Sequence, residues 1–235
     1  MTTQTRGNDQ MELAAHNTAH STRRFSRFIS VIAAACSCCV PLSAATLYES
    51  ATLGETGSNT GFVLDSDQFL GSRFSLSRTS QITAVGGHID RRSGATLWGA
   101  IVEMSDVLPT FEPAQIEANV VASVVFTAPD PSDDLLTPLS LVLGPGDYAL
   151  IFGGGAFFGA DGDGVMPSSN TDTADGVGSY FFSIVADNTW FNGGLSNARF
   201  VVEGFVVPVP AALWLLGSGL LASAAIGRRR RAATA

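Results

Sequence analysis

The sequence predicts an all-β protein: an antiparallel β-sandwich body, jelly-roll-like, between an N-terminal signal peptide and a single C-terminal transmembrane helix. Three observations lead to this prediction. Short apolar or alternating runs recur between turn residues through the middle of the chain. No sustained helical period is found outside the two end segments. Arginines cluster at both ends around an acidic middle, a distribution typical of targeting segments that flank an exported domain.

Composition and charge exclude several classes of function. The chain has 235 residues, of which 46% are hydrophobic, and its net charge is −8. Residues 46–207 hold nineteen carboxylates against five arginines, so the body is predicted not to bind nucleic acid, whose phosphates require cationic contacts. All 13 basic residues are arginine. Without lysine, Schiff-base chemistry and P-loop phosphate binding are excluded.

Residues 1–45 are predicted to form a signal peptide for export. Three arginines precede an apolar run over residues 28–40, which is too short to span a bilayer, and small residues follow it. Cleavage is predicted after Ala44 or Ala45. Met11 is an alternative start of the chain, and a twin-arginine route is an alternative because two of the three arginines are adjacent.

The three cysteines, Cys36, Cys38 and Cys39, all lie inside this signal peptide. The mature body would therefore contain no disulfide, no cysteine nucleophile and no thiolate metal site. A lipoprotein signal at Cys36 is an alternative, which would shorten the apolar run.

Residues 46–206 are predicted to form one domain, because about 160 residues suffice for one sandwich core. Segments 129–133 and 144–147 are predicted loops or turns, and the Gly-, Asp- and Ser-rich stretch 153–178 is predicted to be the longest irregular part. The nine predicted strands are 46–53, 68–76, 81–89, 96–104, 119–127, 139–143, 148–152, 179–185 and 199–206.

The body contains a single histidine, His88, two positions before Asp90. A Ser-His-Asp site needs a histidine base and a carboxylate that orients it, but a histidine beside Gly86 and Gly87 is predicted to be a turn or edge residue. No Gly-x-Ser-x-Gly nucleophile elbow occurs in the body. We therefore assign no catalytic residue and expect that the protein is not an enzyme.

A Gly-rich turn with Asp161 and Asp163 is the candidate metal site. Two carboxylates on a flexible turn can bind Ca²⁺ through their oxygens, and Asp172 and Asp175 follow in the same region. The pattern is not an EF-hand, because Val165 stands where a third ligand is needed. A solvated acidic loop is the alternative interpretation, and no other cofactor is predicted.

Several aromatic residues raise the alternative of carbohydrate binding. Exposed rings can stack on sugars, whereas the aromatic residues of a sandwich more often belong to its core. The candidate residues are Trp98, Phe157, Phe158, Trp190 and Phe191.

Segment 207–231 combines a proline pair, an apolar run and an arginine cluster. Pro208 and Pro210, on either side of Val209, favour an extended backbone that cannot donate ladder hydrogen bonds at the prolines. The uncharged residues 211–226 are predicted to form a transmembrane helix, whose sixteen residues reach roughly 24 Å, slightly less than a bilayer core.

The residues around this apolar run predict its orientation. Arginines are retained on the cytoplasmic side and can snorkel to the interface, so the body would lie outside. Trp214 lies near the opposite end of the run, where aromatic residues favour the interface. Gly217 and Gly219 allow a close approach of another helix. The predicted stop-transfer cluster is Arg228, Arg229, Arg230 and Arg231.

These three parts, in this order, resemble the PEP-CTERM sorting signal of Gram-negative bacteria, the substrate tail of exosortases. The run Val-Pro-Val-Pro-Ala-Ala-Leu-Trp-Leu-Leu-Gly-Ser-Gly-Leu is similar to a common variant of that tail, with Val209 in place of the Glu of the Pro-Glu-Pro motif. The resemblance covers about 25 of the 235 residues and leaves the central domain unassigned. It implies that an exosortase-like membrane peptidase removes the tail near Pro208–Pro210 and releases the body.

We therefore expect an exported protein that is transiently anchored in the inner membrane with its domain outside. After processing it would reside at the cell surface or in the extracellular matrix, with a structural or adhesive role in an exopolysaccharide or biofilm setting. The alternatives are a carbohydrate- or calcium-binding β-sandwich module and a plain single-pass membrane-anchored protein. A secreted hydrolase has the least support from the sequence.

Overall fold

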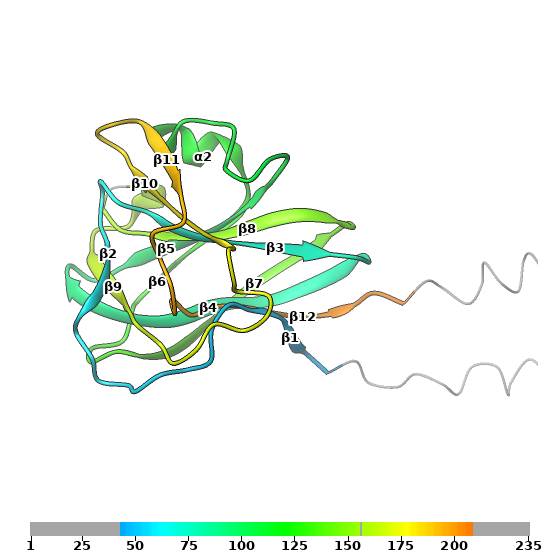
Figure 1. Cartoon of the computed structure of the whole chain (residues 1–235), viewed down its shortest axis with the longest axis horizontal. Helices are drawn as coiled ribbons and strands as arrows, with labels where there is room; N and C mark the ends of the chain where they lie inside the picture. The colour runs from blue at the N-terminus through cyan, green and yellow to red at the C-terminus, as the bar shows by residue number, and fades with distance from the viewer. Residues whose placement is uncertain (1–42, 156, 209–235) are drawn as a thin grey trace, which may run out of the picture. The chain divides into compact units, whose positions relative to one another are not determined.

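The computed structural model describes residues 43–155 and 157–208, which form two antiparallel β-sheets (Figure 1). This confirms the predicted all-β, antiparallel character of the body. The signal-peptide prediction up to residue 42 and the transmembrane prediction for 211–226 lie outside the described residues.

The first sheet has six strands. Five of them follow the order β1, β12, β4, β9, β2, and the sixth, β7, pairs with β4 on the side opposite β12. Its long central strand, β4, pairs in succession with several partners and so connects the whole sheet. The strands are β1 (Ala45–Glu49), β12 (Phe200–Val206), β4 (Ser80–Ser93), β9 (Asp163–Pro167), β2 (Gly61–Leu64) and β7 (Asp133–Leu143).

The second sheet also has six strands, in the order β11, β10, β3, β8, β5, β6. They are β11 (Thr189–Asn192), β10 (Tyr180–Ile184), β3 (Leu70–Leu76), β8 (Gly146–Gly153), β5 (Leu97–Glu103) and β6 (Val120–Phe126). Three short helical segments connect the strands of the described chain: η1 (Pro113–Gln115), α2 (Ile116–Asn119) and η2 (Phe157–Gly159).

The main core lies between the two sheets. Strand β4 contributes Val85 and Ile89, and β8 of the other sheet contributes Leu150 and Phe152 to the same buried cluster. The ring of Phe152 stacks on that of Phe200 from β12 at 5.5 Å between centroids. Because these side chains come from both layers, the sheets pack face to face like a sandwich.

A second core covers the other face of the second sheet. Trp98 of β5, Phe69 and Phe181 are buried there against Ile116 of α2. The central strands β5 and β8 are therefore buried on both faces, which explains why their sequences read as continuous apolar runs rather than as alternating patterns.

Each of the nine predicted strands corresponds to an observed strand, but three further strands were not predicted. Strands β2 and β11 have four residues each, and β9 has five and lies inside the stretch 153–178 that was expected to be irregular. Strand β7 begins at Asp133 rather than at residue 139, because it continues along β4 into the predicted loop.

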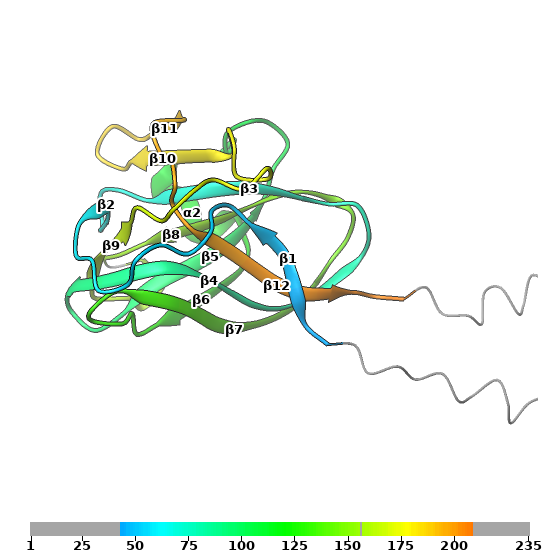
Figure 2. The same cartoon turned by 60° about the horizontal axis from the view of Figure 1, so that its bottom comes forward.

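The chain enters and leaves the described body at the same end. Strands β1 and β12 are antiparallel neighbours, with Ala45 opposite Gly204 (Figures 1 and 2). In the part of the chain that the structure describes, the last ladder-like hydrogen bond runs from the Val207 N–H to the Thr79 carbonyl, at 2.9 Å. Pro208 follows directly, and its nitrogen has no hydrogen to donate.

Candidate functional site

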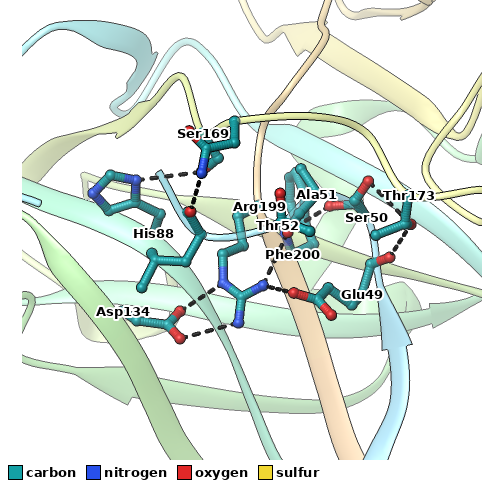
Figure 3. A network of polar contacts seen from close by, with 12 residues as sticks. Glu49, Ser50, Ala51, Thr52, His88, Asp134, Ser169, Thr173, Arg199 and Phe200 are labelled. Carbon is teal, nitrogen blue, oxygen red and sulfur yellow. Dashed lines mark hydrogen bonds and ion pairs between the residues drawn. The ribbon is translucent and has the colours of Figure 1, made fainter. Parts of the chain in front are cut away.

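The outer face of the first sheet holds the buried histidine. Since Val85 and Ile89 of β4 point into the main core, the alternation of a strand turns His88 and Asp90 to the opposite face. His88 has no exposed surface. Its Nδ1 is 3.3 Å from the Ser169 Oγ and its Nε2 is 3.2 Å from the Ser132 Oγ (Figure 3 shows His88 and Ser169).

The prediction that His88 is a turn or edge residue was wrong, because Gly86 and Gly87 do not form a turn. They lie inside β4, where a Cβ would collide with a neighbouring backbone on each side. A Cβ on Gly86 would be 1.7 Å from the Leu135 carbonyl oxygen, and one on Gly87 would be 2.1 Å from that of Arg199. The two glycines therefore allow β7 and the start of β12 to approach β4 closely.

The surroundings of His88 do not match a catalytic histidine. Burial lowers the pKa of its imidazole, and the carboxylates of Asp133 and Asp90 only partly oppose this effect. A catalytic relay places a carboxylate on one ring nitrogen and a nucleophile on the other, whereas serine hydroxyls occupy both positions here. The neutral ring thus bridges two loop segments across β4.

Asp90 is an unusual neighbour of this histidine. The residue is 3% exposed, and its Oδ1 has no hydrogen-bond partner among the described residues. Burial raises the pKa of the Asp90 carboxyl, and the nearby charge of Asp130 raises it further. A buried carboxyl oxygen without a donor disfavours the charged form.

An arginine clamp lies on the same face and joins three strands (Figure 3). The guanidinium of Arg199, just before β12, donates two parallel hydrogen bonds to Asp134 of β7, at 2.9 and 3.0 Å. It also pairs with Glu49 of β1 and donates to the Ala51 carbonyl at 2.9 Å. The Arg199 side chain is 11% exposed, so the clamp is a largely buried cross-link.

The sequence contained no spacing signal for this clamp. Glu49, Asp134 and Arg199 come from three segments that are far apart along the chain. Only the pairing of β1 with β12, and of β12 and β7 with β4, brings them together.

The carboxylates of the calcium hypothesis are engaged with the turn between β4 and β5. The Asp161 Oδ1 accepts hydrogen bonds from the Thr96 hydroxyl at 2.8 Å and from the Thr96 and Ala95 N–H groups at 2.9 and 3.1 Å. These bonds, with the Thr96 hydroxyl first, lower the pKa of Asp161. The Asp163 Oδ2 accepts from the Ser93 hydroxyl at 2.9 Å.

The neighbouring carboxylates do not join them. Asp172 accepts from the Tyr180 hydroxyl at 2.5 Å and from the Asn197 N–H at 2.7 Å. Over residues 43–155 and 157–208, no group of three or more His, Cys, Asp or Glu side chains is arranged to hold a metal ion. Calcium binding therefore stays a prediction from the sequence.

Among the candidate residues for carbohydrate binding, the two tryptophans are buried. Trp98 has no exposed surface and donates its indole N–H to the Gly154 carbonyl at 3.0 Å. Trp190 is 8% exposed and donates to the Phe111 carbonyl at 2.7 Å. Both belong to the second core, and Phe191 stacks separately on Phe182 at 5.1 Å. A sugar-stacking platform that includes Trp98 and Trp190 is therefore contradicted, because the second core buries both rings. Phe157 and Phe158 are partly buried against the same core, and carbohydrate binding by the body stays a prediction from the sequence.

The body also has a cleft that sequence reasoning did not find. Its volume is about 470 Å³, within the range of small-ligand sites. The Arg73 guanidinium is held there by the carbonyls of Val107, at 2.6 Å, and Gly178. The lining residues are Arg73, Phe74, Ser75, Met104, Ser105, Asp106, Val107 and Asp147.

Most residues of the predicted sorting tail lie outside the described part of the chain. Pro208 is the last described residue and is exposed, and Ala44 is exposed just before Ala45 opens β1. Within the described residues no helix is long and apolar enough to cross a membrane. The tail residues that are not described are Val209, Pro210, Trp214, Gly217, Gly219, Arg228, Arg229, Arg230 and Arg231.

Comparison with models of known protein families and with curated proteins gives no match for this chain.

Proposed function

We propose that the chain is an exported cell-surface or extracellular-matrix protein whose C-terminal tail is processed by an exosortase-type membrane peptidase. The observation that carries this proposal is the pairing of β1 with β12, in which Ala45 lies opposite Gly204. Before processing, a signal peptide and a C-terminal membrane segment would both attach the body to one membrane. Both ends of the body must then reach the same membrane. Because the two ends of the body lie at the same end of the fold, they can do so without long linkers.

The position of the proline pair agrees with a detachable tail. Among the described residues, the last hydrogen bond of this strand is donated by the Val207 N–H to the Thr79 carbonyl, at 2.9 Å. At about 3.3 Å per extended residue, residues 208–210 would separate the body from the proposed membrane segment by about 10 Å. The proposed cleavage region would thus be a short extended stalk between a folded domain and the membrane.

The body is proposed to be a jelly-roll sandwich with a structural or adhesive role near exopolysaccharide. Its eight main strands, numbered along the chain, have the order 1-8-3-6 in one layer (β1, β12, β4, β7) and 2-7-4-5 in the other (β3, β8, β5, β6). Two Greek keys in a jelly roll produce this order. A role without catalysis is supported by the complete burial of His88, the one histidine of the body.

Mass spectrometry of the mature protein tests the processing step. In cells that contain the peptidase, we expect the mature C-terminus near Pro208–Pro210. The double substitution Pro208→Ala and Pro210→Ala should abolish this cleavage, because the backbone there loses its restriction to extended conformations. Pro145→Ala is the matched control, since Pro145 is exposed in the turn between β7 and β8.

Two outcomes would contradict the proposal. A mature wild-type chain that retains Arg228–Arg231 would indicate a permanent single-pass anchor. Unchanged cleavage in the double proline variant would show that the proline pair does not direct processing.

A further inference from the structure

The cleft of the second sheet is built by neighbouring strands and by the segment that follows one of them. Strands β3 and β8 lie side by side (Figure 1), with Ser75 opposite Asp147. The Ser75 hydroxyl donates to the Asp147 Oδ1 at 2.5 Å. The Met104 N–H, just after β5, donates to the Asp147 carbonyl at 2.9 Å, and residues 105–107 complete the lining. The sheet therefore fixes the positions of the polar groups in the cleft.

The polar side chains of the cleft point outwards from the second sheet. Phe74 of β3 and Tyr148 of β8 belong to the main core between the sheets. Since successive side chains of a strand alternate between its faces, Arg73, Ser75 and Asp147 point away from that core. Asp147 is exposed and Arg73 is partly exposed. A ligand can therefore reach these side chains from solvent.

Arg73 supplies a cation that is held in place but not neutralised. Its guanidinium donates to the carbonyls of Val107, at 2.6 Å, and Gly178. Within the described residues, no carboxylate forms an ion pair with it. A guanidinium has five N–H groups, so those that the two carbonyls do not use can donate to a ligand. Such preorganisation lowers the entropic cost of binding.

Two carboxylates line the same cleft and supply acceptors. The Asp106 Oδ1 accepts from the Val107 N–H at 2.6 Å, and the Asp147 Oδ1 accepts from Ser75. A carboxylate has two oxygens that can accept, and neither Oδ2 accepts a hydrogen bond from the described residues. The cleft therefore combines positioned acceptors with a positioned donor.

We propose that this cleft binds a neutral sugar unit of a polysaccharide. Hydroxyl groups both donate and accept, so one sugar ring can donate to the two carboxylates and accept from the guanidinium. Its C–H groups can pack on Val107, which is 55% exposed. An anion would be repelled by Asp106 and Asp147, and a cation by Arg73. The choice of a polysaccharide rather than a free sugar rests on the proposed adhesive role near exopolysaccharide.

Isothermal titration of the mature protein, purified from cells that express the whole chain, tests the proposal. The probes are gluco-, manno- and galacto-oligosaccharides, compared with oligomers of uronic acids and of glucosamine. At least one neutral series should bind. Its affinity should change little between low and high salt, because a neutral ligand carries no charge to be screened. Binding of the charged oligomers alone would contradict the proposal.

Two substitutions distinguish the classes of ligand by the sign of their effects. Arg73→Met removes the donor and should weaken the binding of a neutral sugar by about tenfold or more. Asp147→Asn keeps the size of the side chain and an oxygen for Ser75, but it removes the charged acceptor and should also weaken binding. For an anionic ligand Asp147→Asn would instead strengthen binding, and for a cationic ligand Arg73→Met would do so.

The matched controls make the same changes of charge outside the cleft. Arg91→Met and Asp187→Asn alter residues that do not line it, so both should bind sugar like the wild type.

Three results would overturn the proposal. They are a wild-type protein that binds none of the neutral probes, a folded Asp147→Asn protein with unchanged affinity, and tighter binding by either cleft variant. Asp147→Asn keeps the test decisive even if Arg73→Met does not fold. None of these results would change the mature C-terminus found by mass spectrometry, so the proposed processing of the tail is tested separately.

Discussion

Burial lowers the pKa of the His88 imidazole in the folded body, so the folded state disfavours the protonated ring. In the unfolded chain the pKa returns to about 6.5, so below this pH the unfolded state binds a proton that the folded state does not. The contribution of His88 to stability is therefore complete above about pH 6.5 and is lost as the pH falls towards the folded pKa.

The expected result is a melting temperature that falls more steeply in the wild type than in His88→Gln between about pH 7.5 and pH 5. Glutamine keeps hydrogen-bonding groups near the two serines but has no proton to gain. Thermal unfolding followed by circular dichroism over a pH series measures the difference. Parallel pH curves for the two proteins would contradict a linked titration of His88.

The contribution of Asp90 to stability depends on pH in the opposite direction to that of His88. Its folded pKa is raised, mainly by burial, so its favourable contribution is present below the unfolded pKa and is lost as the pH rises through the folded value. When Asp90 ionises, its Oδ1 is buried without a donor among the described residues. We expect Asp90→Asn to increase the free energy of unfolding at pH 7 by about 1 kcal/mol.

Denaturant unfolding at pH 7 and at acidic pH checks this prediction. The gain from Asp90→Asn should shrink as the pH falls, because the wild-type carboxyl then becomes neutral as well. Asp187→Asn, at an exposed turn residue, should leave stability almost unchanged at both pH values. A loss of stability in Asp90→Asn at pH 7 would indicate that the ionised carboxylate has a partner that stabilises it.

At the scale of the strands, the Arg199 clamp connects β1, β12 and β7. Arg199→Met should remove about 2 kcal/mol or more of stability, because Asp134 and Glu49 would lose the cation that compensates their burial. Arg91→Met is the matched control: Arg91 pairs with Asp130 at 3.5 Å, and their side chains are 33% and 59% exposed. Such an exposed pair contributes less than about 1 kcal/mol.

Chemical denaturation of the two variants in the same buffer compares them directly. A loss of equal size in Arg199→Met and Arg91→Met would show that the clamp contributes no more than an ordinary surface pair.

The sequence predicted nine of the described strands, because their apolar or alternating runs are a local property of the chain. It missed β2, β9 and β11, whose four or five residues are too few to establish a period. The sequence analysis also placed Gly86 and Gly87 in a turn or at a strand edge. In the structure they lie inside β4, where the lack of a Cβ allows neighbouring backbones to approach closely. The clamp and the cleft could not be predicted, because strand pairing between distant segments assembles them.

At the scale of the whole molecule, the acidic body and the arginine clusters at both ends of the chain are evident from the sequence alone, whereas the arrangement of the layers required the structure. The aromatic residues show the difference. Their number was evident from the sequence, but only the packing of α2 and its loops on the second sheet explains why Trp98 has no exposed surface. The same packing gives the body two cores on either side of one sheet.

The position of β12 between β1 and β4 has a consequence for biogenesis. The last of the described strands occupies the interior of a layer, so β1, the first described strand, has no strand partner until residues 200–206 have been synthesised. A chain that terminates early would leave β1 and one side of β4 uncovered and open to quality-control proteases. The topology thus makes completion of synthesis through β12 a condition for a fully paired first sheet.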